Sequence, residues 1–365
     1  MHPAPFTVEA TDGAARAGTL ELAHGAVPTP TFMPVGTRGV VKALDTTDLE
    51  ALGASMVLAN TYHLMLRPGG DVVERLGGLH GFTGWSGPFL TDSGGYQVFS
   101  LEPTITEAGA EFRSTYDGST VHIGPESSMA IQQALGADVA MAFDHLIGLP
   151  APREAVREAM ERTLRWTERA MAVHDRDDQA LFGIVQGGVD GELRAESARR
   201  TAELALPGFG IGGLSVGESA AERNAALDAC IAELPAGKVR YVMGLGDTEG
   251  VLDAVARGAD LFDCVWPTRL ARHGKVLTAA GDYNIRTLAN VEDGRPLDDD
   301  CGCLTCRRHS RAYLRHLHRT GELTAHRLLS IHNLHYTLEV LRGARVAISE
   351  GRFDGFRAGV LAARA

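Results

Sequence analysis

The chain has 365 residues, of which 44% are hydrophobic, and its formal net charge is −11. This length and hydrophobic content allow a large core, and the acidic balance argues against a general nucleic-acid binder without excluding a local basic patch. The sequence has no apolar run of about twenty residues and no secretion signal at its start, so we expect a cytoplasmic protein with no membrane span.

Short apolar runs bounded by glycine, proline or polar residues predict strands along most of the chain. Residues 6–22, with a turn near Asp12 and Gly13, predict a hairpin that covers the bottom of the fold. Eight further strands are predicted in chain order at residues 31–35, 55–60, 88–92, 138–144, 181–186, 209–214, 240–244 and 260–265.

Helical patterns separate most of these strands. Thr47 and Glu50 predict a capping box that opens a short helix ending near Leu52. Longer amphipathic patterns predict helices at residues 153–174, 191–206, 219–234 and 249–257. Eight strands alternating with helices predict an α/β fold, a parallel (β/α)8 TIM barrel, with a doubly wound open sheet as the alternative.

Two segments interrupt the alternation. Residues 111–122 predict a hairpin whose turn lies at Asp117 and Gly118. Residues 279–365 contain a cysteine cluster and several helical patterns. We therefore expect a catalytic barrel formed by residues 1–278, and a zinc-binding subdomain with C-terminal helices, residues 279–365, that packs on it.

Polar residues recur where the predicted strands end. In barrel enzymes the carboxyl ends of the strands meet at one mouth, where the chemistry takes place. A single polar residue there can be a helix cap, but three aspartates and a glutamine together predict a site. The strand ends carry Asn60, Asp92, Asp144, Gln186, Gly213, Met243 and Asp263.

Asp92 and Asp263 are the candidate reacting groups. Asp92 precedes Gly94 and Gly95, which allow a tight turn and a close approach of backbone to a ligand. An ionised aspartate beside a sugar carbon is a competent nucleophile, and a second carboxylate can act as acid and base at a glycosidic bond. The alternative for Asp92 is a turn with a helix cap.

Asp144 and Gln186 can specify a purine. A carboxylate accepts from the N–H groups on the Watson–Crick edge of guanine, and an amide or glycine N–H donates to its oxygen. Tyr96 and Met243 could cover the faces of such a base, although core packing is the alternative for Met243. The run GFGIGG at residues 208–213 has dinucleotide-fingerprint spacing, but the helical pattern before it argues against that assignment.

Cys301, Cys303 and Cys306 form a C-x-C-x2-C cluster, which in a cytoplasmic protein indicates metal before disulfide. Three thiolates and one imidazole suit a closed structural zinc site, with three free thiols as the alternative. A metallohydrolase barrel would need histidines on its first strand, and residues 31–35 have none. Spacing leaves the fourth ligand open among His309, His316, His318, His332 and His335.

With these residues assembled, the chain resembles the bacterial tRNA-guanine transglycosylases, also called queuine tRNA-ribosyltransferases, from about Phe6 to Arg357. The resemblance is carried by NTYHLMLRPG, TDSGGYQVFSL, IVQGG, IGGLSVGE, YVMGLG, FDCVWPTR, CGCLTC, SRAYLRHL and IHN. It implies a pentosyltransferase of queuosine biosynthesis that exchanges the wobble guanine of tRNAs with a GUN anticodon for a 7-deazaguanine. It also implies a covalent aspartyl–ribosyl intermediate, one structural Zn²⁺ per subunit and a homodimer.

The resemblance implies a role for each matched residue. Asp263 would be the nucleophile, and Asp92 would protonate departing guanine and deprotonate the incoming base. The base would be held by Asp92, Ser93, Gly94, Gly95, Tyr96, Asp144, Gln186, Gly213, Leu214 and Met243. The RNA would be contacted by a loop of Gly244, Leu245, Gly246, Asp247, Thr248, Glu249 and Gly250, and by Thr268, Arg269, Leu270, Ala271 and Arg272. The zinc ligands would be Cys301, Cys303, Cys306 and His332.

One position departs from the family pattern. His145 and Leu146 follow Asp144, where bacterial members usually have Glu-Cys. Val216 keeps the bacterial residue and would crowd the cyclopentenediol of queuine, so we expect 7-aminomethyl-7-deazaguanine as the incoming base. Its aminomethyl group would meet the carbonyl of Leu214.

Two alternative functions accompany this interpretation, and the role of one basic stretch stays open. The sequence TRLAR at residues 268–272 argues against a base-exchange enzyme for another nucleic-acid position, because residues that read the anticodon would have no role in such an enzyme. A non-catalytic RNA-binding subunit is opposed by the two retained aspartates, Asp92 and Asp263. The basic residues 307–319 either contact RNA or form a solvated helix face.

Overall fold

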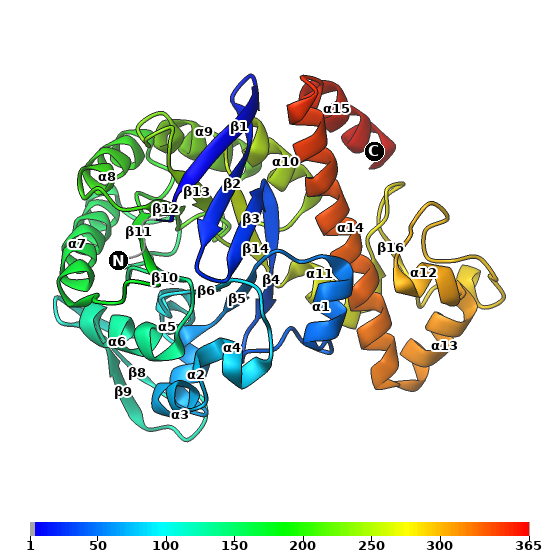
Figure 1. The fold of residues 1–365 in the computed structure, drawn as a ribbon, viewed down its shortest axis with the longest axis horizontal. Helices are drawn as coiled ribbons and strands as arrows, with labels where there is room; N and C mark the ends of the chain where they lie inside the picture. Colours follow the sequence, from blue (N-terminus) through cyan, green and yellow to red (C-terminus); the bar gives the residue numbers. More distant parts are fainter. Residues whose placement is uncertain (1–3, 365) are drawn as a thin grey trace.

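A closed barrel of eight parallel strands forms the centre of the computed structural model, which describes residues 4–364 (Figure 1). Its last strand is hydrogen-bonded to its first, so the predicted (β/α)8 TIM barrel is confirmed and the open sheet is excluded. Around the barrel the strands are β4 (Thr31–Gly36), β5 (Val57–Ala59), β6 (Phe89–Thr91), β10 (Val139–Met141), β11 (Ala180–Val185), β12 (Gly208–Ile211), β13 (Val239–Val242) and β14 (Leu261–Cys264).

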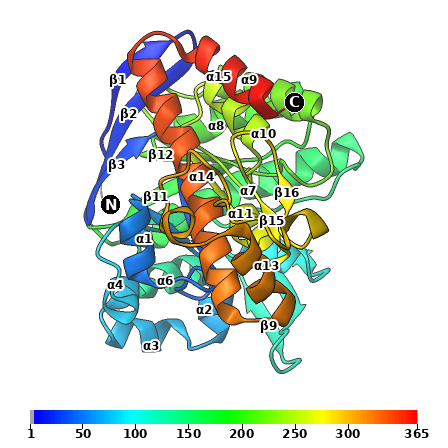
Figure 2. The same cartoon turned by 90° about the vertical axis from the view of Figure 1, so that its right-hand side faces the viewer.

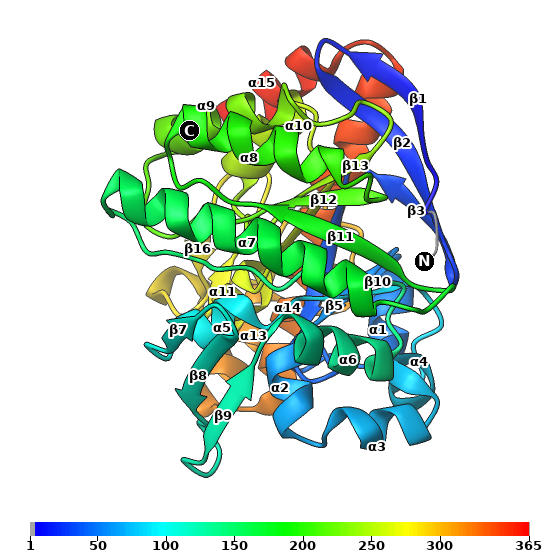
Figure 3. The same cartoon turned by 90° about the vertical axis from the view of Figure 1, so that its left-hand side faces the viewer.

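Helices cover the outside of this barrel, and α7, α8 and α9 run side by side along one flank (Figure 3). The four longer predicted helices are confirmed, with bounds that agree to within three residues. The helices up to the last barrel strand are α1 (Thr46–Leu52), α2 (Thr61–Leu66), α3 (Gly70–Arg75), α4 (Gly78–Thr83), α5 (Gly95–Phe99), α6 (Pro125–Leu135), α7 (Arg153–Val173), α8 (Gly191–Glu203), α9 (Ala220–Ile231) and α10 (Thr248–Ala256).

The predicted capping box of the first helix is wrong. The N-cap of α1 is Asp45, whose side chain accepts the N–H of Asp48 at 2.9 Å, while the Asp48 carboxylate accepts the N–H of Asp45. Asp45 still has an extended backbone, whereas Thr47 lies inside the helix and donates its hydroxyl to Asp45 at 2.6 Å. Asp45 is therefore the N-cap of α1, and Thr47 and Glu50 lie inside the helix.

Residues along each barrel strand alternate between the two sides of the sheet. The inward residues Met33, Leu58 and Phe182 belong to one apolar cluster with Leu20 and Val27 of the N-terminal segment. That segment forms a three-stranded sheet, β1 (Phe6–Asp12), β2 (Ala15–Leu22) and β3 (Gly25–Thr29). The predicted hairpin is therefore confirmed, and a third strand that was not predicted extends it across the end of the barrel.

Arg16 ties this sheet to the barrel. Its Nε donates to Asp260 Oδ1 at 2.8 Å, and its other nitrogens donate to the carbonyls of Ala236 and Lys238 at 2.6 Å. Asp260 directly precedes β14, so the pair lies at the amino end of the strands. The predicted hairpin at 111–122 is also confirmed, as β8 (Gly109–Arg113) and β9 (Thr120–Ile123), with β7 (Thr104–Thr106) beside them.

The long helix α14 (Leu323–Ser349) packs against β4, α1, α10 and α11 (Trp266–Arg272) (Figure 2). Its residues Ile331 and Leu338 share an apolar cluster with Phe32 and Phe262, which face outward from the first and last strands. The helix therefore covers the seam where the barrel closes. The other elements after β14 are β15 (Lys275–Val276), β16 (Tyr283–Asn284), η1 (Leu288–Asn290), α12 (Leu304–Arg308), α13 (Arg311–Thr320) and α15 (Phe353–Arg364).

Within residues 4–364, no helix combines the length and the apolar character that crossing a membrane requires.

Candidate active site

A cavity of about 200 Å³ lies at the carboxyl ends of the barrel strands. It receives side chains or backbone from most of the predicted strand ends, which confirms that barrel closure brings them to one place. The predicted site residues that line it are Asp92, Ser93, Tyr96, Asp144, Gly213, Leu214, Met243, Gly244 and Asp263. The remaining predicted base-site residues are hydrogen-bonded to residues that line it: the N–H of Gly94 donates to Asp92, the N–H of Gly95 to Ser93 and the side-chain amide of Gln186 to Asp144.

Asp92 lies just after β6 and is buried. Its carboxylate accepts the side-chain amide of Asn60, and its Oδ1 accepts the N–H of Thr61 at 2.8 Å and of Gly94 at 3.2 Å. Burial raises the pKa of Asp92 to about 6, although the hydrogen bonds from Asn60 and Thr61 act in the opposite direction. A carboxyl group with this pKa can hold or release a proton close to neutral pH.

Asp263 lies within β14, the last barrel strand. Its Oδ1 accepts the hydroxyl of Tyr241 at 2.6 Å and the N–H of Gly244 at 2.8 Å. Burial raises the pKa of Asp263, and these two hydrogen bonds lower it in part. Both bonds go to the same oxygen, Oδ1, and orient the carboxylate.

Asp144 is fixed between two donors on the opposite wall. The hydroxyl of Ser93 donates to its Oδ1 at 3.0 Å, and the side-chain amide of Gln186 donates to its Oδ2 at 2.7 Å. Burial raises the pKa of Asp144, and the bonds from Gln186 and Ser93 oppose that effect. The carboxylate is therefore presented in one orientation, with acceptor capacity left for a ligand.

Two glycines make room for this arrangement. A Cβ atom on Gly95 would lie 2.6 Å from Asp144 Oδ1, and one on Gly213 would lie 2.2 Å from Gln186 Oε1. Gly213 also has a φ of +68°, in the left-handed region that favours glycine. Any side chain at either position would displace a polar group of the site.

The remaining walls are mostly apolar. Tyr96 is 61% exposed at the rim, and Met243 lies partly buried deeper in the cavity. Leu146 and Val216, the two positions that the sequence singled out for base preference, both line the cavity. The loop carrying Val216 is held by Glu218, whose carboxylate accepts the N–H of Ser215 and, at 3.0 Å, that of Val216.

The residues expected to contact RNA differ in exposure. Asp247 caps α10 by accepting the N–H of Gly250 at 2.7 Å, so Thr248–Ala256 is helical and the expected loop from Gly244 to Gly250 is wrong in its second half. The exposed members are Gly244, Asp247, Glu249 and Arg269; Thr248, Leu270 and Arg272 are half-buried; and Leu245, Gly246, Gly250, Thr268 and Ala271 are buried.

The basic stretch 307–319 is partly engaged in packing. Arg311 donates to the carbonyl of Pro296 at 2.7 Å, and Arg315 donates to that of Thr287 at 3.0 Å. These two guanidinium groups therefore hold the loops around α13.

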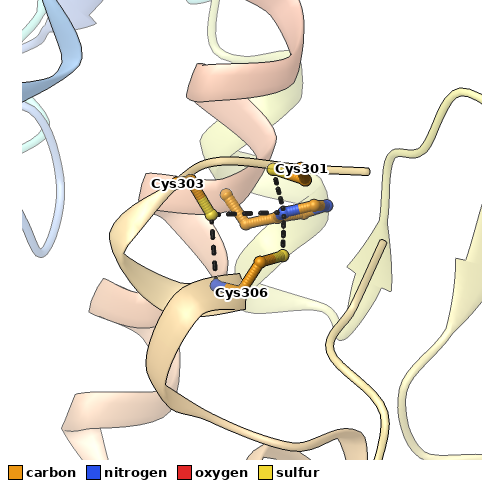
Figure 4. Close-up of side chains that lie close together, drawn as sticks. Cys301, Cys303 and Cys306 are labelled. Atoms are coloured by element: carbon orange, nitrogen blue, oxygen red, sulfur yellow. Dashed lines mark hydrogen bonds between the residues drawn. The ribbon is translucent and has the colours of Figure 1, made fainter. Parts of the chain in front are cut away.

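Cys301, Cys303 and Cys306 converge, as Figure 4 shows, and their sulfur atoms lie 3.6, 3.6 and 3.3 Å from His332 Nδ1. A tetrahedral zinc ion with its usual bond lengths separates sulfur and nitrogen ligands by about 3.6 Å, so the donor set fits that ion. The other ring nitrogen, Nε2, lies 2.8 Å from the carbonyl of Leu277, which orients the imidazole. The four residues form a group able to bind a metal.

His24, His80 and Asp138 form a second group of possible ligands at the opposite end of the barrel. Asp138 accepts the backbone N–H groups of His24 and Phe89, each at 2.8 Å. The two imidazole rings are stacked with an interplanar angle of 14°, so their in-plane lone pairs lie in nearly parallel planes, an arrangement poorly suited to binding one ion. Hydrogen bonding accounts for this group.

Tyr241, Glu218 and Arg194 are among the residues of the site that are absent from the sequence-based predictions. Tyr241 could have been found, because it lies two residues before Met243 in the predicted strand 240–244, where residues two apart face the same side. Glu218 carries a signal only as part of the stretch IGGLSVGE. Arg194, buried behind the cavity, has none, because it stands among other arginines in an amphipathic helix.

Known proteins resemble this chain along nearly its whole length. The model of the family described as queuine tRNA-ribosyltransferase matches residues 11–365. The queuine tRNA-ribosyltransferase of Thermus thermophilus is 51% identical over 358 residues, which cover 98% of this chain and 93% of the relative. That of Moorella thermoacetica is 49% identical, with 97% and 96% covered, and that of Desulforamulus reducens is 50% identical, with 94% and 93% covered. The chain therefore belongs to the queuine tRNA-ribosyltransferase family.

Proposed function

We propose that the protein is a tRNA-guanine transglycosylase that replaces the wobble guanine of GUN-anticodon tRNAs with a 7-deazaguanine by double displacement. The observation that carries the proposal is the placement of Asp92 and Asp263 on one cavity that also presents the oriented carboxylate of Asp144. Membership of the family supports the reaction class.

Asp263 is the nucleophile in this mechanism. Its Oδ2 attacks C1′ of the ribose, an ester bond forms, and the bond from C1′ to the guanine nitrogen breaks. Tyr241 and Gly244 hold Oδ1, which keeps the attacking oxygen directed into the cavity. The electron pair of the broken bond leaves with guanine.

Asp92 manages the proton in both half-reactions. In its acid form it protonates the departing guanine, and the resulting carboxylate takes the proton from the ring nitrogen of the incoming base. That nitrogen then attacks C1′ and releases Asp263. Two inversions at C1′ preserve its configuration, and the pKa of about 6 gives Asp92 access to both protonation states.

Asp144 recognises the base by accepting from the two N–H groups on its Watson–Crick edge. Gly213 and Gln186 face the base oxygen, and Tyr96 and Met243 cover its faces. The target nucleotide leaves the anticodon stack to reach this cavity, which costs a few kcal/mol. Arg269, which is exposed on α11, contributes to RNA binding.

The incoming base in this proposal is 7-aminomethyl-7-deazaguanine. Val216 and Leu146 limit the space beside the base, and the carbonyl of Leu214 accepts from the aminomethyl group. A zinc ion held by Cys301, Cys303, Cys306 and His332 is structural, because four protein ligands leave no open position. The active form is a homodimer.

The experiment is exchange of radiolabelled guanine into tRNA with a GUN anticodon, combined with denaturing gels that detect a covalent tRNA adduct. We expect exchange by the unsubstituted protein and by Asp228→Asn, a control on the surface of α9. Asp263→Asn should bind tRNA without forming the adduct. An adduct at the unsubstituted level in Asp263→Asn would exclude that residue as nucleophile, and no exchange by the unsubstituted protein would exclude the function.

A further inference from the structure

Arg194 lies on α8 directly behind the cavity, with an exposed fraction of 0%. Its Nε donates to the carbonyl of Gly188 at 2.7 Å, and Nη1 donates to those of Val185 at 3.0 Å and Gly212 at 2.8 Å. Nη2 donates to the carbonyl of Gly213 at 3.3 Å. A guanidinium buried on backbone carbonyls instead of a carboxylate is unusual, because a buried charge is costly without a counter-charge.

These bonds determine which way the neighbouring peptide points. In a planar trans peptide the C=O and the N–H of the same unit point in opposite directions. The carbonyl of Gly212 points at Arg194, so the N–H of Gly213 points away from it. Gly212 and Gly213 line the cavity whereas Arg194 lies behind it, so this N–H is directed to the ligand side. Within residues 4–364, no protein acceptor is recorded for it.

The same bonds tie two strand ends together. Val185 and Gly188 flank Gln186 after β11, and Gly212 and Gly213 follow β12. The guanidinium of Arg194 thus holds the backbone before and after Gln186 and also the backbone of Gly212 and Gly213. Glycines offer little resistance to rotation of their own, so the peptide orientation depends on such external contacts.

We propose that Arg194 is a positioning residue for recognition of the 6-oxygen of guanine: it holds the peptide between Gly212 and Gly213 so that the Gly213 N–H donates to that oxygen. The inference deepens the proposed function and rests on it. Arg194 itself does not touch the base.

The guanidinium also strengthens the donor that it positions. A hydrogen bond to a carbonyl polarises its peptide unit, which makes the N–H at the other end a better donor. When the glycosidic bond breaks, negative charge spreads onto the oxygen of the leaving guanine. A fixed N–H aimed at that oxygen stabilises this charge without reorganisation.

The test compares two free bases, guanine and 2-aminopurine, which lacks the 6-oxygen and also the N1–H that Asp144 accepts. The missing N1–H affects every enzyme variant alike, so only a change in the ratio of the two affinities between variants reports on the 6-oxygen. Their affinities are measured by competition against guanine exchange in the unsubstituted enzyme, Arg194→Met and Arg194→Lys. We expect Arg194→Met to weaken guanine binding about tenfold, the value of one such hydrogen bond, and to change 2-aminopurine binding by less than about twofold. Arg194→Lys keeps a cation with three donors and should restore part of the ratio.

Arg240→Met is the matched control. Arg240 is a second buried arginine that donates to carbonyls, those of Gly258 at 3.3 Å and Leu234 at 3.0 Å, at the other end of the barrel. It should lower the melting temperature and leave the guanine to 2-aminopurine ratio unchanged. If the role of Arg194 were only structural, Arg194→Met would likewise lower the melting temperature and leave this ratio unchanged.

The inference is overturned if Arg194→Met leaves the ratio unchanged, or if neither Arg194 variant folds by circular dichroism. Loss of the proposed function is a separate result, because it appears in the unsubstituted protein as absence of guanine exchange. That result would also overturn the inference.

Discussion

Asp92 and Asp263 face one cavity from β6 and β14, and the negative charge of Asp263 is one of the causes that raise the pKa of Asp92 to about 6. Burial is the larger cause. The strands β4 and β5 separate β6 from β14 in the closed sheet, so the pair exists only because the barrel closes between β14 and β4. The fold therefore places a proton-holding carboxyl opposite a second carboxylate.

The raised pKa of Asp92 predicts a pH-dependent change in stability. A carboxyl whose folded pKa exceeds the unfolded value of 3.8 stabilises the fold below that value and loses the contribution as pH rises through about 6. This difference corresponds to about 3 kcal/mol. Asp92→Asn removes the titration, so its unfolding free energy should gain up to about 3 kcal/mol relative to the unsubstituted protein between pH 4 and pH 8.

Urea unfolding of both proteins at pH 4, 6 and 8 measures this difference. Titration of the groups remote from Asp92 is common to the two proteins and cancels. A difference that stays constant across the range would show that Asp92 titrates at its ordinary pKa in the folded state.

Asp144→Asn should weaken base recognition more than tRNA binding. The NH2 group of the new asparagine must face either the side-chain amide of Gln186 or the N–H groups of guanine. Two donors then face each other where the Asp144 carboxylate accepted from both partners. Loss of such a paired contact corresponds to about 1–3 kcal/mol, and we expect the KM for guanine to rise roughly tenfold to a hundredfold. The KM for tRNA should stay within about twofold, and an equal rise in both constants would contradict the assignment.

Cys306→Ser should remove the bound metal and lower the melting temperature by roughly 5 °C or more. The Cys306 thiolate is one of four donors to the ion. Without the ion, neither the His332 side chain nor its hydrogen bond to the carbonyl of Leu277 is held in place. Elemental analysis and thermal denaturation measure the two effects. Cys230→Ala, outside the cluster, is the control and should keep its metal. Stoichiometric metal in Cys306→Ser, or zinc missing from the unsubstituted protein, would refute the site.

Val216→Gly should open the cavity to queuine. The unsubstituted protein should incorporate 7-aminomethyl-7-deazaguanine and reject queuine, because the Val216 side chain lines the cavity where the cyclopentenediol of queuine would have to lie. Removing the side chain should raise kcat/KM for queuine about tenfold or more, the usual effect of relieving a steric clash of this size. Incorporation of 7-aminomethyl-7-deazaguanine by the same variant is the internal control. Efficient use of queuine by the unsubstituted protein would overturn the preference.

The barrel could be predicted because each strand is a short apolar run with clear breaks, and the site because polar residues follow those runs. Most of the predicted strands nevertheless extend too far at their carboxyl ends: Asp144, for example, lies three residues after Met141, the last residue of β10. The hydrogen-bonded ladder ends before the chain turns, and no local pattern marks that point. The site residues therefore lie mainly on loops.

Other features depend on contacts between distant segments and could not be predicted. The burial of Arg194 requires α8 to pack beneath the ends of β11 and β12, and its helix reads as an ordinary surface helix. The Asp45 cap is a local feature, and it could not be predicted because Thr47 offers a competing cap nearby.

The boundary between residues 278 and 279, the homodimer and the cytoplasmic location stay predictions.

The position of α14 bears on how the protein is made. The helix that covers the seam between β14 and β4 begins only at Leu323, well after the last barrel strand ends at Cys264. During synthesis the ribosome must add the whole cysteine-containing segment before this seam receives its cover. Until Leu323–Ser349 has left the ribosome, the apolar side chains at this seam, Phe32 and Phe262 among them, have no helix to cover them and offer chaperones a binding surface.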